Sequence, residues 1–154
     1  MEPIEIAAWV FHSLFSSVWT GSVLFLTLAV LPLARNGTLN ATPLESVARK
    51  IKLISRTCAV VLLLTGGHMA GQQYTSESLF ETKSGWLVLA MVTFWFFLMT
   101  TVEIGGAKLT DGTERDKVRE PANNARPFFL TASLLAVLLL VTAGLISAQN
   151  LGYL

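Results

Sequence analysis

The chain has few of the residues on which most soluble enzymes rely. Only 14% of its 154 residues are charged, against roughly 25% in a soluble globular domain. It has a single cysteine, Cys58, which excludes an internal disulfide and a thiolate metal cage. The sequence has no phosphate-binding loop, nucleophile triad, zinc motif or basic patch that needs a nucleic-acid partner. Residues counted as hydrophobic make up 53% of the chain instead.

These hydrophobic residues lie in four long stretches, at about 4–33, 53–71, 86–104 and 128–148, and the mean hydropathy of the chain is +0.59. Each stretch has about the 20 residues that a helix needs to cross a ~30 Å hydrocarbon core. Lipid cannot pair with backbone groups, so such stretches are expected to be helical. We predict an all-α polytopic membrane protein in a lipid bilayer, a single domain over 1–154 with four transmembrane helices in an antiparallel bundle.

The predicted helices span about 4–33, 43–71, 85–105 and 127–149. The second starts at Pro43 because Thr42-Pro43-Leu44-Glu45 has the form of a capping box. The first is expected to be retained, since Glu2 and Glu5 stand where a signal peptide has basic residues. The connection of about two dozen residues between helices three and four is predicted to be a loop, with one helical turn around TERDKV.

The basic residues are distributed unevenly. Ten of the eleven lie in the first and third connections and the adjoining helix ends, and only Lys83 lies in the second. The positive-inside rule therefore places those two connections in the cytoplasm and both termini outside the cell membrane. Long faces of small residues favour a homodimer.

The chain has only two histidines, His12 in the first apolar stretch and His68 near the end of the second. In antiparallel helices these positions belong to the same half of the membrane, where a titratable side chain usually marks function. We predict that both ligate one b-type haem, with electron transfer or haem handling as the function and a redox partner possible. Ser16, Trp19 and Thr65 are the predicted neighbours of the ligands.

Copper is the alternative occupant, bound by the same histidines and by Met69, because imidazole and thioether suit Cu(I). Neighbouring helical residues project about 100° apart, which makes it hard for His68 and Met69 to face one ion. Met91 lies in the outer half of helix three. A third alternative is a non-catalytic accessory membrane subunit, and whether the chain is an enzyme stays open.

A second polar group is predicted at the cytoplasmic ends of the helices. Arg56, Glu103 and Arg126 lie at similar depth and are expected to form an ion cluster. Such a cluster is structural, or linked to a proton or an anion.

The segment AAWVFHSLFSSVWTGSVLF resembles the first helix of CopD-like membrane proteins and of the related HemJ-type proteins. The segments LTGGHMAGQQYT and LTDGTERDKVREPANNARPFF are similar to small four-helix members from halophilic archaea, often labelled as transporters. The resemblance implies either copper resistance and uptake or b-haem binding with protoporphyrinogen oxidation. It matches His12 to the helix-one ligand of that group, and His68 by position only. The functional lysine of the HemJ-type helix three has no counterpart in 85–105.

Overall fold

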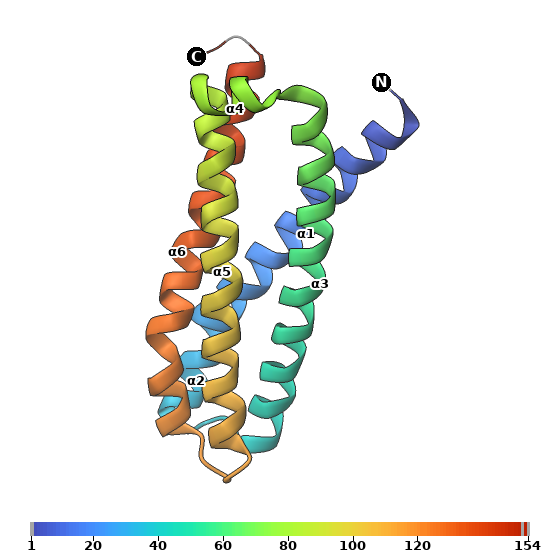
Figure 1. Ribbon diagram of the computed structural model, residues 1–154. Helices are drawn as coiled ribbons and strands as arrows, with labels where there is room; N and C mark the ends of the chain where they lie inside the picture. Colours follow the sequence, from blue (N-terminus) through green and yellow to red (C-terminus); the bar gives the residue numbers. More distant parts are fainter. Residues whose placement is uncertain (1, 152, 154) are drawn as a thin grey trace.

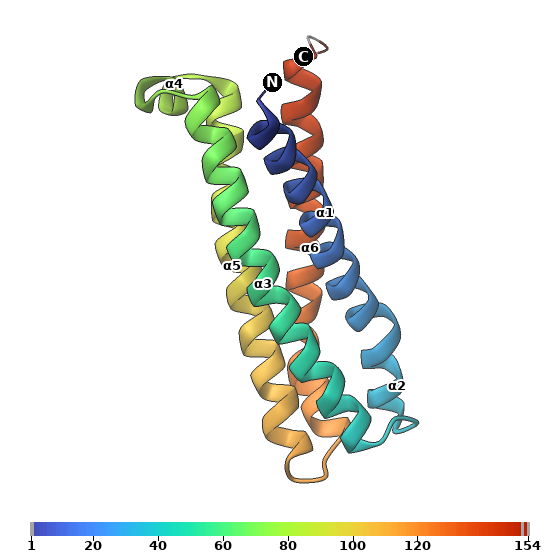
Figure 2. The same cartoon turned by 90° about the vertical axis from the view of Figure 1, so that its right-hand side faces the viewer.

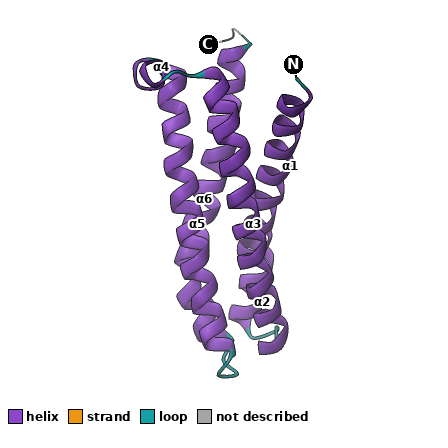
Figure 3. Cartoon of the chain, turned by 45° about the vertical axis from the view of Figure 1, so that its right-hand side comes forward, coloured by secondary structure: helices purple, strands orange, loops and turns teal. Residues whose placement is uncertain are grey.

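The computed structural model describes residues 2–151 and 153, and this part of the chain contains helices and no strand (Figure 3). Four helical segments are long and apolar enough to cross a membrane. The all-α, four-helix membrane fold is therefore confirmed. In chain order the elements are α1 (Pro3–Phe25), the π-helical turn η1 (Leu26–Val30), α2 (Leu31–Asn36), α3 (Ala41–Gln73), α4 (Ser76–Glu81), α5 (Lys83–Thr113) and α6 (Arg119–Asn150).

The helices run up and down in an antiparallel bundle (Figure 1). One end of the bundle, which we call the terminal end, carries both chain termini and α4. The other, the basic end, carries α2 and the connections 37–40 and 114–118. The helix α5 packs most extensively on α6, while α1 packs mainly on α3. Towards the terminal end, α1 tilts away from α5 and α6 (Figures 1 and 3).

The core of the bundle is densest from its middle to the basic end. Small residues on one face of α6 are fully buried there and let the other helices approach closely: Ala122, Ala125, Ala132 and Ala136. The outer surface carries many large apolar side chains, such as Leu28, Leu64 and Leu134, each at least 60% exposed. A surface of this kind suits lipid rather than water.

The connection between α5 and α6 spans only residues 114–118, which corrects the predicted loop of about two dozen residues. We predicted the end of helix three at Gly105, but the helix continues through Gly105 and Gly106 to Thr113. A Cβ atom at Gly105 would lie 2.9 Å from the Phe129 ring, and one at Gly106 would lie 2.6 Å from Cγ of Lys52. These glycines therefore permit close packing and do not end the helix.

Two further boundaries differ from the predictions. The helix α6 begins at Arg119 rather than near Pro127, because Pro121 falls in its first turn, where a backbone N–H is not needed, and Pro127 is accommodated inside it. The helix α3 begins at Ala41 with Asn40 as its N-cap, so the predicted capping box does not form. Glu45 pairs with Arg49 instead, at 2.5 Å.

A widened π-helical turn, Leu26–Val30, precedes Pro32, which has no backbone N–H to donate. Within this turn the Thr27 hydroxyl donates to the carbonyl oxygen of Val23 or Phe129, at 2.8 and 3.2 Å, and accepts from Ser133 Oγ at 2.8 Å. These contacts fasten η1 to α6 on the basic-end side of the region where α1 diverges from α6. Figure 2 shows α1 descending obliquely from the terminal end to α2 at the basic end.

Candidate metal-binding site

His12 lies on the face of α1 that contacts α3, and its side chain is partly buried. Its Nδ1 atom lies 2.9 Å from Oγ1 of Thr65. The Thr65 hydroxyl has one hydrogen, which it donates to the carbonyl oxygen of Val61 at 2.7 Å. Oγ1 of Thr65 therefore accepts from His12, which assigns the ring hydrogen to Nδ1 and leaves a lone pair on Nε2. Nε2 is the atom of His12 that is free to bind a metal ion.

The His12 ring lies directly against the backbone of α3 at Gly66. A Cβ atom added to Gly66 would lie 3.0 Å from Cε1 of His12, closer than ordinary van der Waals contact. The neighbouring Gly67 has open space around the same position. Glycine at position 66 is thus what allows the ring to reach Thr65.

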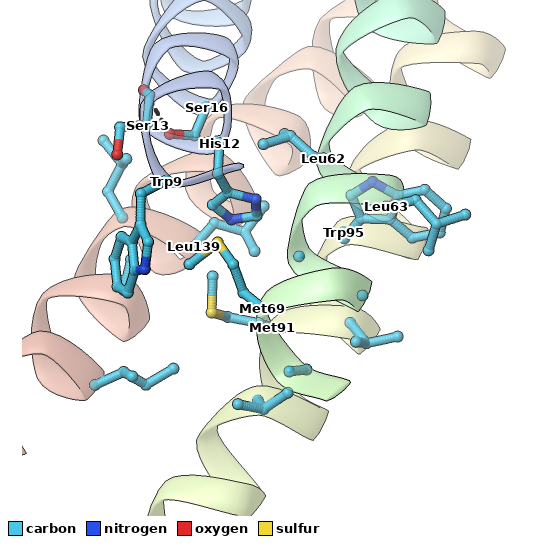
Figure 4. Close-up of a pocket in the computed structure, with 18 of the residues that line it drawn as sticks. Trp9, His12, Ser13, Ser16, Leu62, Leu63, Met69, Met91, Trp95 and Leu139 are labelled. Carbon is cyan, nitrogen blue, oxygen red and sulfur yellow. Dashed lines mark hydrogen bonds between the residues drawn. The ribbon is translucent and has the colours of Figure 1, made fainter. Parts of the chain in front are cut away.

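His12 lines a cavity of about 300 Å³ between α1, α3, α5 and α6, which we call the inner cavity. The thioethers of Met69 and Met91 point into the same space as the His12 ring (Figure 4). Most of the remaining wall is apolar, and no charged side chain in the described part of the chain lines it. The apolar wall includes Trp9, Leu63, Val88, Val92, Trp95, Leu139, Leu140 and Ile146.

The inner cavity has a closed floor on the side of the basic end. Trp19 lies seven residues beyond His12, Leu98 seven beyond Met91, and Leu62 seven before Met69. Since α3 runs antiparallel to α1 and α5, all three lie about 10 Å, or two helical turns, below the corresponding side chains. They line the cavity and are each at most 8% exposed. The His12 imidazole and the thioethers of Met69 and Met91 therefore lie above a packed layer.

His68 lines a second cavity of about 590 Å³, which we call the outer cavity. Its Nε2 atom is buried and has no hydrogen-bond partner among the described residues. The wall of the outer cavity consists of Glu5, Trp9, His68, Met69, Gln72 and Gln73. Three of these residues, Trp9, Met69 and Gln73, also line the inner cavity.

The structure thus does not bring the two predicted ligands, His12 and His68, to one cavity. Bis-histidine ligation of a haem requires an imidazole on each face of one macrocycle. Helix rotation explains the outcome, because His68 and Met69 project in different directions from α3. Met69 turns toward His12, and His68 does not.

The predicted neighbours of the ligands have different roles. Thr65 bonds directly to His12. Ser16 lines the inner cavity but donates to the backbone oxygen of Ser13 in its own helix, at 2.9 Å. Trp19 donates from Nε1 to Oγ of the buried Ser55 at 3.0 Å, so it belongs to the cavity floor and ties α1 to α3.

The predicted ion cluster is reduced to a pair in the structure. Arg56 donates twice to Glu103, at 2.8 and 2.7 Å, and so links α3 to α5. Arg126 is exposed and forms no ion pair within the described residues. The side chain of Lys52 lies nearby instead, across Gly106 and one turn along α5 from Glu103. This pair lies towards the basic end, away from both cavities.

Sequence reasoning left Met91 and Glu5 out of the candidate site. Met91 is one of two methionines in an apolar helix, and only its depth, matched to that of Met69, marks it. Glu5 was considered only as an argument against a signal peptide. Both residues enter the site because of how the helices are tilted and rotated.

A family model described as "Copper resistance protein D" matches residues 45–148 of the chain. The chain belongs to this CopD family. The match covers α3 to α6, including Met69, Met91 and His68, and leaves α1 with His12 outside. No curated protein and no solved structure matches the chain. Family membership indicates a multi-pass membrane protein linked to copper resistance.

Proposed function

We propose that this CopD-family protein binds Cu(I) inside the membrane as a step in copper handling, with His12, Met69 and Met91 as ligands. The observation that carries the proposal is the meeting of one free imidazole nitrogen and two thioethers in a single cavity (Figure 4). Thioether and imidazole are ligands suited to Cu(I). Copper is here the cargo of the protein.

The charge of the cavity favours a monovalent ion. Transfer of an ion into an apolar medium costs more as its charge rises, and buried charge is normally compensated by opposite charge. The inner cavity has neutral ligands and no carboxylate among the residues that line it. Zn²⁺ or Cu²⁺ would remain uncompensated there, whereas Cu⁺ carries half the charge and forms polarisable bonds to sulfur.

The Thr65 hydroxyl contacts the nitrogen of the His12 ring that would not bind the ion, and so holds the ring in place. Histidine ligands to metals usually donate their second ring nitrogen to an oxygen, which sets the tautomer and the ring orientation. The bond from Nδ1 of His12 to Oγ1 of Thr65 has this arrangement. The ligand is therefore preorganised before the ion arrives.

The distribution of basic residues indicates which side of the membrane the site faces. Ten of the eleven Lys and Arg residues lie towards the basic end, so we propose that this end faces the cytoplasm and that the cavities lie in the extracytoplasmic half. The floor of Trp19, Leu62 and Leu98 then separates the bound ion from the cytoplasm. Copper is taken up and held from the outside in this conformation.

Haem b, with electron transfer, ranks behind copper. It needs two axial ligands in one cavity, whereas His12 and His68 line separate ones. The same geometry also counts against a copper ion held by both histidines.

Competition for Cu(I) between the detergent-purified protein and a chromophoric chelator tests the proposal. His12→Ala, Met69→Leu and Met91→Leu are each expected to weaken binding by about 100-fold, the upper range for loss of even an indirect metal contact. Met99→Leu is the matched control, since Met99 packs on the core and lines neither cavity. Unchanged affinity in the three variants would refute the copper site. An absorption spectrum with a Soret band that both histidine substitutions abolish would establish haem instead.

A further inference from the structure

The outer cavity differs in chemistry from the inner one. Of the six residues that line it, only Trp9 lacks a side-chain oxygen, sulfur or imidazole nitrogen that can bind a cation. The other five are Glu5, His68, Met69, Gln72 and Gln73. It lies between the first turns of α1 and the last turns of α3, at the terminal end of the bundle. The outer cavity therefore offers polar groups to a cation that comes from the water at this end.

Glu5 is the only carboxylate among the described residues that line either cavity. Its Oε2 atom accepts a hydrogen bond from the backbone N–H of Glu2 at 2.9 Å, which holds the side chain at the first turn of α1. A fixed negative charge in a cleft with low-dielectric walls raises the local concentration of cations.

His68 supplies a ligand atom that the fold itself does not use. Its Nε2 is buried and has no partner within the described chain. Buried polar atoms without partners are uncommon in folded proteins and call for an explanation. Since His68 lines the outer cavity, a rotation of its ring toward the cavity would give Nε2 a bound cation as its partner.

Met69 connects the two cavities. It follows His68 directly in the chain and lines both cavities, as do Trp9 and Gln73. Methionine has three rotatable side-chain bonds and a polarizable sulfur atom, so one thioether can serve two neighbouring positions. An ion can therefore change ligands from one cavity to the other without returning to water.

We infer that the outer cavity is a loading site for Cu(I), in which Glu5 attracts the ion, His68 Nε2 binds it, and Met69 transfers it to His12 and Met91. This inference rests on the proposed copper function. In the transfer, the bond from copper to His68 breaks as the bond to His12 forms, and Met69 stays bound. Copper remains Cu(I) throughout, so the step needs no oxidant or reductant.

Loading kinetics test the inference in the full-length, detergent-purified protein. The protein is mixed with the Cu(I) complex of a chromophoric chelator, and the loss of colour gives both a rate and an equilibrium endpoint. We expect His68→Ala and Glu5→Gln to slow loading by about tenfold or more, the lower range of electrostatic effects on association rates. Their endpoints should stay within about twofold of wild type, because the inner ligands remain.

Glu5→Gln keeps an oxygen that can accept from the Glu2 backbone, so the helix start is preserved and the variant tests charge alone. Glu81→Gln is its control, a change of an exposed carboxylate in α4 at the same end that lines neither cavity. His12→Ala and Met91→Leu should lower the endpoint.

Unaltered rates in His68→Ala and Glu5→Gln would overturn the loading site and leave the inner copper site standing. A lost endpoint in His68→Ala would overturn it too, since His68 would then belong to the final site. An endpoint unaffected by His12→Ala and Met91→Leu would refute the proposed function itself.

Discussion

At the scale of single residues, one hydroxyl decides which nitrogen of His12 faces the cavity. We assign the Thr65 hydrogen to the carbonyl oxygen of Val61 because that contact is only 2.7 Å long, and with this assignment Oγ1 accepts from His12. The contact with Gly66 then fixes where the ring lies. Both contacts can be changed by small substitutions that leave the ligands in place.

Thr65→Val removes the acceptor for Nδ1–H of His12 while keeping a β-branched side chain of similar shape. We expect the affinity for Cu(I) to fall by about 10- to 100-fold, the usual cost of losing an indirect contact to a metal ligand. Chelator competition measures the change. Thr100→Val is the control, because the Thr100 hydroxyl bonds only to its own helix at Phe96. Equal affinities in the two variants would show that the hydroxyl does not orient the ring.

Gly66→Ala is expected to weaken Cu(I) binding without lowering the stability of the protein. Alanine favours a helix interior by about 1 kcal/mol over glycine, but its Cβ would press on Cε1 of His12 at 3.0 Å. Copper affinity should fall while thermal stability stays level or rises. Gly67→Ala, where the added Cβ meets nothing within 4 Å, should leave affinity at the wild-type value. A weaker affinity in Gly67→Ala alone would contradict this account of the ring position.

At the scale of helices, the glycines of α5 and the tilt of α1 divide the bundle into two regions. Below the cavities, Gly105 lets the Phe129 ring of α6 approach α5 within van der Waals distance. Above, α1 diverges from α5 and α6 (Figure 1), and residues of these three helices and of α3 line the inner cavity there. Tight packing in one half of the bundle supports the opening in the other.

Gly105→Ala should destabilise the bundle, because the new Cβ would lie 2.9 Å from the buried Phe129 ring. We expect a loss of about 1–3 kcal/mol in the free energy of unfolding, as for other overpacked cores. Thermal unfolding in detergent measures it. Gly144→Ala, in open space on α6, is the control and should not lose stability. A stabilised Gly105→Ala would show that α5 and α6 can separate at little cost.

At the scale of the whole molecule, the two ends of the bundle differ in charge and in packing. The basic end carries ten of the eleven basic residues, short connections and a filled core. The terminal end carries both cavities and the carboxylate of Glu5. If the basic end faces the cytoplasm, the proposed copper ligands are reached from outside the cell.

Thiol labelling in intact cells tests this orientation. The native Cys58 is 1% exposed and is replaced by alanine to remove any background. Glu77→Cys in α4 should react with a membrane-impermeant reagent, and Arg115→Cys in the 114–118 connection should react only after the membrane is opened. If instead Arg115→Cys reacts in intact cells and Glu77→Cys does not, the orientation is the opposite one and both cavities lie on the cytoplasmic side.

The four membrane helices and the uneven placement of charge could be predicted from sequence. The length of an apolar segment and the positions of Lys and Arg beside it are local properties, and they decide directly whether the segment suits a bilayer. His12 and Thr65 were among the predicted site residues and are in contact, while their role in binding stays a prediction. Helix ends were predicted less well. Gly105 and Pro127 were interpreted as boundaries, although the packing of Phe129 on Gly105 and the surrounding bundle keep both helices continuous.

By itself, then, the sequence determined that this chain crosses the membrane four times and carries two histidines toward the end that holds its termini. Only the tertiary structure decided which side chains meet. Met69 and Met91 line the cavity of His12, while His68 lines another with Glu5. The physical reason is that the rotation and tilt of each helix are set by contacts between helices, such as that of His12 with Gly66. These contacts cannot be deduced from the sequence of one helix alone.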